Sequence, residues 1–266
     1  ASLFQSRQLE TLDDSRGPAY QPPNGKITGG SRFLADQAQC PFNAFARWRL
    51  GAQSLAEAMT GLPPTLRGVL VHNSLEMFWR ETADSQALHK LSDEDRRQRL
   101  ADAITKAMQG FFRRQNGLIQ EQDYGTRHLA LEKQRLIRLL DNWLQVEMER
   151  SPFAVANSEL KAELALGNFT LSLRLDRVDR LPSGGIVIID YKTGQSGIGA
   201  ITGERLLEPQ LPLYALALKA TSDEALTAVT YAKINIRALG FDGLAESPDL
   251  LAGCQSLSKK GLPESW

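Results

Sequence analysis

The spacing of hydrophobic residues changes near residue 150. Between about Ser31 and Arg150 apolar residues recur every three or four positions, as at Leu136, Leu140 and Leu144. This spacing is typical of helices that bury one face. After the Ser151-Pro152 dipeptide apolar and polar residues alternate, which is typical of half-buried strands. The pattern predicts a helical first part and a second part built on a sheet.

Four helices are predicted in the first part. Residues 1–30 are polar and contain seven glycines and prolines, so we expect a linker or a loosely packed lead-in there. The first helix covers about Pro41–Gly51. Ser92 and Asp95 form a capping-box pattern before a long helix that reaches about Arg114. The other two helices are predicted over about Val69–Trp79 and His128–Glu149.

Alternating residues in the second part predict a hairpin and a central strand. Glu159–Leu166 and Phe169–Asp176 each place leucines on one face, and Gly167-Asn168 supplies the turn between them. Ile186–Asp190 is almost entirely apolar, which indicates a strand buried on both faces. The remaining predicted elements are a helix near Pro209–Ala220 and a last strand over Val229–Ile236. We therefore expect three segments: a lead-in (1–30), a helical subdomain (31–150) and a sheet domain (151–266).

Composition narrows the class of protein. The 266 residues hold 31 lysines and arginines against 31 aspartates and glutamates, and two cysteines. Balanced charge argues against bulk coating of nucleic acid but leaves room for a nuclease with a local groove. Two cysteines exclude a disulfide scaffold. No apolar run approaches the roughly 20 residues that span a membrane, and the amino end lacks a signal-peptide pattern. We expect a cytoplasmic protein of a bacterial-type cytosol and, because the chain starts at Ala1, a fragment of a longer one.

Acidic residues at the ends of two predicted strands suggest a metal site. Asp190 and Lys192 lie two residues apart, so they share one face of a strand. Asp176 ends the preceding strand, and antiparallel pairing would bring it close to Asp190. Two such carboxylates repel each other unless a proton or a cation lies between them. Because the candidate ligands are oxygens without cysteine or several histidines, the expected cation is Mg²⁺ or Mn²⁺.

An ordered set of motifs resembles a known family. The motifs are Cys40-Pro41-Phe42, Gly68–Glu76 with His72 inside it, Leu175–Asp179, Ile189–Gly194 and Gln210–Tyr214. Together they resemble the nuclease domain of the RecB/AddB family, within the PD-(D/E)XK superfamily of metal-dependent DNA nucleases. The resemblance covers roughly Ile27 to Arg237. It implies a restriction-endonuclease-like α/β fold of the α+β kind, in which a mixed central sheet is flanked by helices and preceded by a helical subdomain.

The resemblance also implies a role for each matching residue. The implied metal ligands are His72, Glu159, Asp176 and Asp190. Lys192 would be the catalytic lysine, beside Asp176, Asp190 and Glu159. Gln210 and Tyr214, four residues apart on one helix face, would orient the lysine or contact the DNA backbone. The implied reaction is in-line attack of a metal-activated water on a phosphodiester, as an exonuclease in DNA repair or recombination, with a helicase subunit or domain as a possible partner.

Several residues keep a second interpretation. Glu159 shares a strand face with Lys161 and Glu163, so a solvated carboxylate stays open, and His72 could be a surface histidine. Asp179 is expected to be a turn residue or an arginine partner. The Gly194–Gly203 loop lacks the Gly-Lys-Ser/Thr ending of a P-loop and is expected to be a flexible active-site loop. The arginines at 96, 97, 99, 113 and 114 form either a solvated helix face or a path for DNA.

The cysteines and one leucine depart from the family pattern. Cys40 matches the first ligand of relatives that carry an iron–sulfur cluster, but Cys254 stands alone, and such a cluster needs four donors. A cluster is expected only if further cysteines follow Trp266 in the parent chain, and Cys40 is otherwise expected to be a buried thiol. Leu173 stands where many relatives have glycine and is predicted to crowd the substrate.

Two rival functions remain at this stage. One is a catalytically silent DNA-binding or scaffolding module of a helicase–nuclease assembly, which Leu173, the missing cysteines and the neutral charge favour. The other is a dimeric endonuclease of the restriction or junction-resolving kind. Metal dependence separates the first rival from a nuclease, and sedimentation tests the second.

Overall fold

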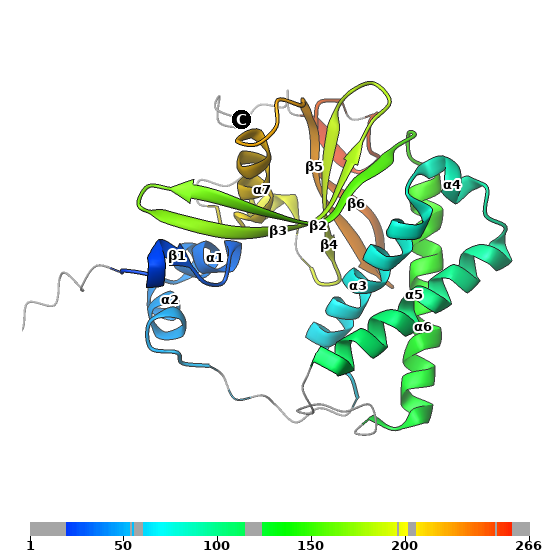
Figure 1. Cartoon of the computed structure of the whole chain (residues 1–266), viewed down its shortest axis with the longest axis horizontal. Coiled ribbons are helices and arrows are strands. Elements are labelled where there is room, and N and C mark those ends of the chain that lie inside the picture. Colours follow the sequence, from blue (N-terminus) through cyan, green and yellow to red (C-terminus); the bar gives the residue numbers. More distant parts are fainter. Residues whose placement is uncertain are drawn as a thin grey trace, which may run out of the picture.

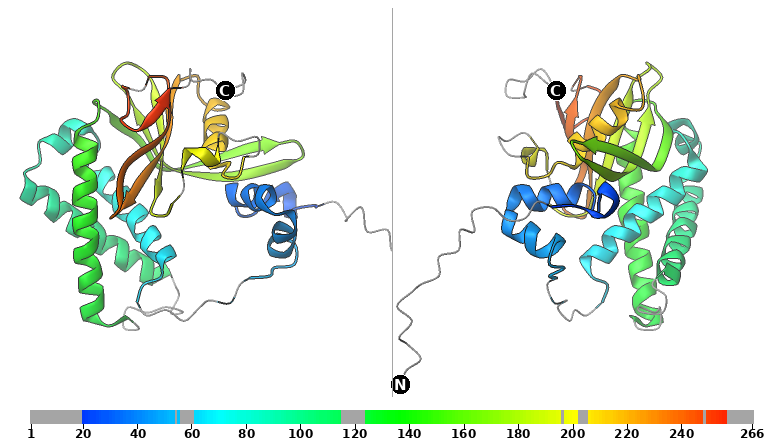
Figure 2. Two further views of the ribbon diagram at one scale, coloured as in Figure 1. Left: turned by 180° about the vertical axis from the view of Figure 1, so that it is seen from behind. Right: turned by 60° about the vertical axis from the view of Figure 1, so that its left-hand side comes forward.

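The structure is a computed structural model that describes residues 20–53, 55, 61–114, 124–195, 197–201, 206–247 and 249–256. It is a mixed α/β molecule in which a seven-stranded sheet lies between helices in the described part of the chain. The long helices α3, α5 and α6 cover one face of the sheet, and α7 covers the other (Figures 1 and 2). Residues 1–19 of the predicted lead-in lie outside the described residues.

The predicted helices are present at their predicted places, and α3 is longer than predicted. The described helices are α1 (Ser31–Gln39), α2 (Pro41–Trp48), α3 (Pro64–Thr82), α4 (Ser85–His89), α5 (Asp93–Arg114), α6 (Thr126–Met148) and α7 (Gln210–Lys219), with short 3-10 turns η1 (Pro23–Gly25) and η3 (Ile198–Ala200). The Ser92 hydroxyl accepts a hydrogen bond from the Asp95 amide at 3.1 Å and donates to the Asp95 carboxylate at 2.6 Å, so the predicted capping box is confirmed. The sequence pattern did not predict α1 or α4.

The strands form one mixed sheet. They are β1 (Lys26–Ile27), β2 (Ala154–Leu166), β3 (Phe169–Arg180), β4 (Ile186–Lys192), β5 (Leu226–Asn235), β6 (Ala238–Ala245) and β7 (Cys254–Ser256). The order is β1-β3-β4-β5-β6-β7, with β2 paired to the other edge of β3. The hairpin of β2 and β3 and the central position of β4 are confirmed. The prediction that Val229–Ile236 forms the last strand is wrong, because β6 and β7 follow β5.

The short strand β1 lies within the predicted lead-in. It runs parallel to β3, with Lys26 opposite Thr170 and Ile27 opposite Leu171. Ile27 is buried in the apolar cluster beneath the β2–β3 hairpin. The helices α1 and α2 follow it and lie under the same hairpin (Figures 1 and 2). The chain is therefore already part of the sheet before the first predicted helix.

Two apolar clusters lie on opposite faces of the sheet, and β3 changes its alternation between them. Leu173, Leu175 and Val178 all belong to the cluster on the α7 side, although Leu175 and Val178 are three residues apart. Strict alternation would place residues three apart on opposite faces, so the alternation is interrupted at Asp176-Arg177. The side chain of Leu173 packs into this core and is 4% exposed. The prediction that it crowds the substrate is therefore wrong.

A closed group of four charges lies below β3, on the side of α6. Arg177 donates to Glu147 at 2.8 Å and to Asp179 at 2.6 Å, and Arg150 donates to the same two carboxylates at 2.6 and 3.0 Å. All four side chains are almost completely buried. The Arg177 guanidinium also stacks on Trp79 at 4.1 Å. The expectation that Asp179 is an arginine partner is confirmed.

The arginines of α5 do not form one face. Arg96 is 2% exposed and donates to Asp141 and Asp93, each at 2.8 Å. Arg97 donates to the second oxygen of Asp141 at 2.8 Å. Both interpretations of the arginine run, as a solvated face or as a DNA path, are therefore wrong for Arg96, because α6 covers this side of α5.

Candidate active site

The sheet places the two predicted aspartates side by side. β3 and β4 pair from Arg180 with Ile186 to Arg177 with Ile189. One step further along this register, Asp176 lies opposite Asp190, at the point where the ladder ends. The amide of Tyr191 donates to Asp176 at 2.8 Å, which joins the two strands at this point. Antiparallel pairing thus brings the two carboxylates together, as the sequence predicted.

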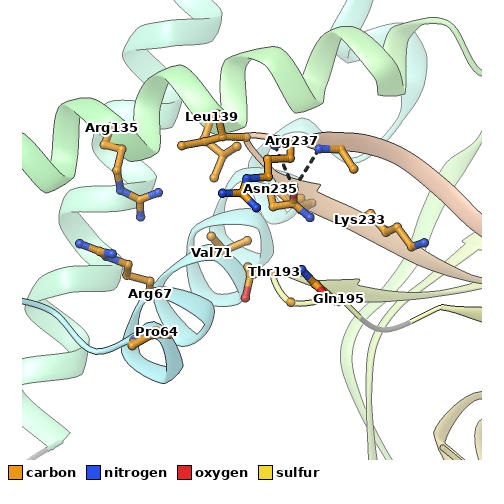
Figure 3. A pocket seen from close by; sticks show the side chains of 14 residues that line it. Pro64, Arg67, Val71, Arg135, Leu139, Thr193, Gln195, Lys233, Asn235 and Arg237 are labelled. Carbon is orange, nitrogen blue, oxygen red and sulfur yellow. Dashed lines mark hydrogen bonds between the residues drawn. The ribbon is translucent and has the colours of Figure 1, made fainter.

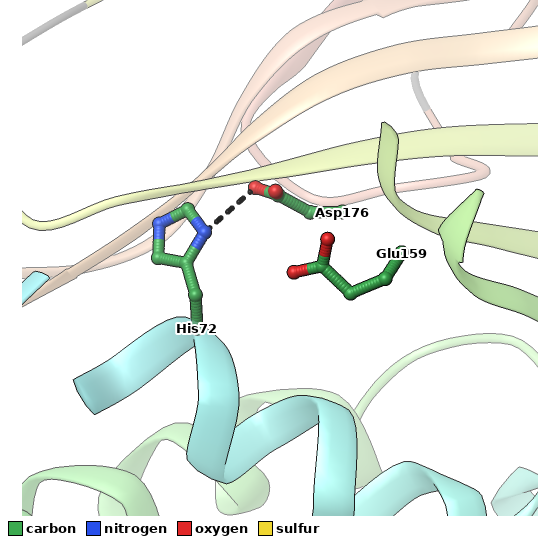
Figure 4. A group of neighbouring side chains, drawn as sticks. All are labelled: His72, Glu159 and Asp176. Atoms are coloured by element: carbon green, nitrogen blue, oxygen red, sulfur yellow. Dashed lines mark ion pairs between the residues drawn. The ribbon is translucent and has the colours of Figure 1, made fainter. Parts of the chain in front are cut away.

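Three of the predicted ligands come together from three elements. His72 of α3, Glu159 of β2 and Asp176 of β3 offer ligand atoms that all lie within 4.8 Å of one another (Figure 4). The Nδ1 atom of His72 lies 3.2 Å from the Asp176 carboxylate. One nitrogen and two carboxylate oxygens at this spacing form a donor set that suits a divalent cation.

Glu159 reaches this cluster through a distorted strand. Its φ is 58°, in the left-handed region that residues other than glycine rarely adopt. The pairing of Ser158 with Arg177 and of Leu160 with Leu175 puts Glu159 opposite Asp176. Its carboxylate forms an ion pair with Arg174, whose side chain is 59% exposed. Unfavourable backbone conformations persist only where the surrounding structure holds them. The strained residue here, Glu159, is also the one whose side chain meets the cluster.

Asp190 belongs to a second set of contacts, which leads to α7. One of its oxygens lies 2.7 Å from the ammonium of Lys192, and the other accepts from the Gln210 side-chain amide at 2.6 Å. Gln210 also accepts from Lys192 at 2.6 Å, and its amide nitrogen lies 2.7 Å from the Tyr214 hydroxyl. Gln210 therefore holds the lysine and the aspartate in one arrangement. Asp190 is not among the three ligands of the cluster just described.

At both His72 and Asp176, burial and the neighbouring charges shift the pKa in opposite directions. Burial disfavours the imidazolium, but the Asp176 carboxylate outweighs it and raises the pKa of His72 above its ordinary value. Burial likewise favours the protonated form of Asp176, but His72, the Tyr191 amide and Lys192 lower the pKa of this carboxyl overall. In the absence of a cation, the two residues therefore form an ion pair.

The surroundings of Asp190 raise the pKa of its carboxyl, whereas those of Asp176 lower it. Its side chain is fully buried, and burial together with the nearby Asp176 carboxylate raises the pKa of Asp190 to about 7, although Lys192 opposes the shift. Burial also raises the pKa of the Tyr214 hydroxyl, and the Asp190 carboxylate adds to this shift. A buried carboxyl with a raised pKa in this position would be stabilised in its ionised form by a bound cation.

The cysteines lie apart from these groups. Cys40, between α1 and α2, is exposed, so the prediction of a buried thiol there is wrong. Cys254 of β7 is buried, and its thiol lies 3.4 Å from the Thr230 hydroxyl. In the described part of the chain, neither cysteine belongs to a group of potential metal ligands. Residues 196, 202 and 203 of the predicted loop, and residues 257–266, lie outside the described residues.

Sequence reasoning missed two residues of the site. Arg174 pairs with Glu159, and its place two residues before Asp176, on the same strand face, is a pattern that could have indicated it. Tyr191 supplies the amide that holds Asp176, while its ring meets the His72 ring edge-on at 5.7 Å and its hydroxyl accepts from Arg177 at 3.3 Å. No sequence pattern indicates these contacts of Tyr191, because they depend on how α3 and β3 pack against β4.

A comparison with protein families identifies the class. The sequence model of the PD-(D/E)XK nuclease superfamily matches residues 34–252. The chain belongs to this superfamily, whose members are generally metal-dependent phosphodiesterases that act on nucleic acid. No curated protein matches the sequence closely enough to add a relative. None of the helices in the described ranges is long and apolar enough to cross a membrane.

Proposed function

We propose that this protein is a Mg²⁺- or Mn²⁺-dependent deoxyribonuclease of the RecB/AddB type, which hydrolyses phosphodiester bonds as an exonuclease in DNA repair or recombination. The observation that carries the proposal is the meeting of Asp176 and Asp190 at the end of the β3–β4 ladder, with Lys192 two residues further on. The ordered motifs around these residues support the RecB/AddB type. A cytoplasmic location and a helicase partner belong to the same proposal.

The donor set fits a divalent metal ion. His72, Glu159 and Asp176 would hold it, and Asp190 would join them by exchanging its contact with Lys192 for the cation. Two features support this fit: the cluster of ligand atoms within 4.8 Å, and the raised pKa of the buried Asp190 carboxyl. When bound, Mg²⁺ or Mn²⁺ supplies a Lewis acid that acidifies water and offsets phosphate charge.

Lys192 is the catalytic cation of the proposed site. Its ammonium has three N–H donors, and two acceptors, Asp190 at 2.7 Å and Gln210 at 2.6 Å, lie within hydrogen-bond reach. The third donor can contact a phosphate oxygen and stabilise the charge that develops there. Gln210 and Tyr214 act through the lysine and the aspartate, so they are positioning residues.

Cys40 enters the proposal only conditionally. Its exposed thiol at the start of α2 would ligate an iron–sulfur cluster only together with three further donors. The proposed nuclease reaction does not use it.

Cleavage assays with the full chain test the proposed function. Linear and circular DNA, single- and double-stranded, are incubated with Mn²⁺ or with EDTA, and products are resolved on a gel. We expect cleavage of the linear forms with Mn²⁺ and none with EDTA. Asp190→Asn should lower the rate about 1000-fold or more, because several kcal/mol of transition-state stabilisation are lost. The matched control is Asp223→Asn, at an exposed aspartate in the turn after α7, which should leave the rate unchanged.

Three results would contradict the proposal or part of it. Well-folded wild-type protein that yields no product from any of these substrates would favour the catalytically silent DNA-binding or scaffolding module. Equal rates for the wild type and Asp190→Asn would remove Asp190 from the reaction. Cleavage of the circular forms at the rate of the linear ones would replace the exonuclease by an endonuclease.

A further inference from the structure

A basic pocket lies next to the proposed active site. Its volume is about 540 Å³, and it is formed by the start of α3, the middle of α6, the loop after β4 and the β5–β6 hairpin (Figure 3). Four cationic side chains line it: Arg67, Arg135, Lys233 and Arg237. Among the described residues that line it, none carries a carboxylate. We call this group of four residues with Thr193 and Gln195 the arginine pocket.

The charges of the arginine pocket are only partly balanced. Glu132 accepts from Arg67 at 2.6 Å and from Arg135 at 2.9 Å, and Asp242 pairs with Lys233 at 2.5 Å. Two carboxylates thus face four cations, which leaves a net charge of plus two. Glu132 is 7% exposed and holds both guanidiniums toward the same space. In the described part of the chain, the buried Nε of Arg67 has no hydrogen-bond acceptor.

Arg237 is presented from the turn of the β5–β6 hairpin. The Asn235 side chain accepts from the amides of Arg237 at 3.0 Å and Ala238 at 2.9 Å, and so closes the turn. The Arg237 side chain is left exposed at the rim of the pocket. An exposed arginine on this turn, beside two oriented guanidiniums, suits an anionic acceptor with two oxygens, such as a phosphodiester.

The arginine pocket is continuous with the active site through two elements. Thr193 follows Lys192 directly on the chain, and Val71 in the pocket wall precedes His72 on α3. These elements approach closely, since a Cβ added to Gly68 would lie 3.3 Å from the Thr193 hydroxyl. A DNA strand carries one phosphate charge for each 3.4 Å of helix axis. A strand whose scissile phosphate lies at Lys192 and that runs along Thr193 would bring neighbouring phosphates toward this pocket.

We propose that the arginine pocket is a subsite that binds backbone phosphates of the DNA strand next to the scissile bond. This inference rests on the proposed function. Its four cationic residues lie outside the family motifs, and it predicts a direction for the strand: from Lys192 past Thr193 toward the β5–β6 turn.

Binding without cleavage tests the subsite. A fluorescent single-stranded oligonucleotide is titrated with the full chain in EDTA, and the dissociation constant is measured by anisotropy over a range of salt concentrations. For Arg237→Ala and for Arg135→Ala we expect affinity to fall about tenfold at low salt. The slope of log affinity against log salt should decrease by about 0.7 for each lost phosphate contact. Arg180→Ala is the matched control. Arg180 is an exposed arginine at the end of β3 that pairs with Glu224, and it does not line the arginine pocket.

The outcomes separate this inference from the proposed function. If Arg237→Ala and Arg135→Ala bind like the wild type and Arg180→Ala, the subsite is overturned even if the wild type cleaves DNA. If binding depends on both arginines but no metal supports cleavage, the subsite stands and the nuclease proposal fails. Inorganic phosphate should displace the strand only at concentrations far above that of the oligonucleotide, because a free phosphate replaces one contact of several. Displacement at the concentration of the oligonucleotide itself would indicate a site for a free anion and would overturn the inference.

Discussion

Two buried groups of charges lie next to each other on β3, and they differ in how their charges are balanced. In the first, Arg177 and Arg150 each contact both Glu147 and Asp179, so two cations face two anions, and each of the four pairs has a contact of 3.0 Å or less. The carboxylates together raise the pKa of Arg177 well above its ordinary value, although burial opposes the shift. The formal charges of this closed group balance, although the buried Nε of Arg150 has no acceptor among the described residues.

The second group, at the end of the β3–β4 ladder, is open. Asp176 and Asp190 share one imidazole and one ammonium, His72 and Lys192. Since the pKa of Asp190 is raised to about 7 by burial and by Asp176, this site is unfavourable as it stands and favours a further cation. Burial of charge is common to both groups, so it does not by itself indicate function. A carboxyl with a raised pKa beside a cluster of potential metal ligands favours a functional role.

The largest effect is expected from breaking the closed group. Arg177→Met leaves Glu147 and Asp179 buried with one cation between them. Removing one partner of a buried ion pair costs about 3–5 kcal/mol, because the other charge stays buried. We expect the free energy of unfolding, measured by urea denaturation, to fall by this amount.

The matched control for this change is Arg180→Ala. Arg180 pairs with Glu224 at 2.7 Å, but both side chains are about half exposed. Exposed pairs contribute about 0–1 kcal/mol, so the free energy of unfolding should hardly change. If Arg177→Met does not fold, Arg177→Lys keeps the charge and should fold with a smaller loss. Equal losses for Arg177→Met and Arg180→Ala would contradict the comparison.

The open group should gain stability from metal ions. A ligand that binds only the folded state at 100 times its dissociation constant stabilises it by about 2.7 kcal/mol. We expect Mn²⁺ to raise the melting temperature of the wild type and of Arg180→Ala, and to have little effect on Asp176→Asn. Differential scanning fluorimetry with Mn²⁺ and with EDTA measures this shift. A full shift in Asp176→Asn would place the metal elsewhere.

The smallest change in stability is expected at Glu132. This carboxylate is buried like those of the closed group, but its partners Arg67 and Arg135 are partly exposed. Burial favours its protonated form, but Arg135 and Arg67 outweigh this and lower its pKa below the ordinary 4.5. A group with a lowered pKa in the folded state stabilises the protein above its unfolded pKa, and this contribution is lost as pH falls through the folded pKa.

Glu132→Gln should therefore lower the free energy of unfolding by about 1–2 kcal/mol at neutral pH. The difference from the wild type should shrink as the pH falls below about 4.5 and should vanish in stronger acid. Urea denaturation at several pH values measures it. A difference that stays constant into strong acid would show that the two arginines do not act on the ionised carboxylate.

Regular patterns predicted most of the elements, and irregular ones were missed. The apolar run of β4 predicted a central strand, and its two neighbours β3 and β5 confirm it. β6 was missed because Gly240 and Gly243 interrupt its alternation. α4 was missed because its five residues, Ser85–His89, are too few for a helical period to appear.

The candidate site shows the same division. Short spacing was enough to predict that Asp190 and Lys192 share a strand face, and that Asp176 lies near them across a turn. The strained backbone of Glu159 and the contact of Arg177 with Glu147 were not predictable in this way. Glu147 and Arg177 are separated by the whole β2 strand, and only packing of α6 on the sheet brings them together.

Local periodicity thus determined the helical first part, the hairpin, the central strand and the shared strand face of Asp190 and Lys192, because these depend on neighbours within a few positions. The tertiary structure decided which charged side chains pair with one another in the closed group and which form the open group that can bind a cation. Leu173 and Arg96 illustrate the limit, since each was assigned to a surface that another element covers. The arginine pocket is the clearest case: its four cations come from two helices and one hairpin, so no window of the sequence contains it.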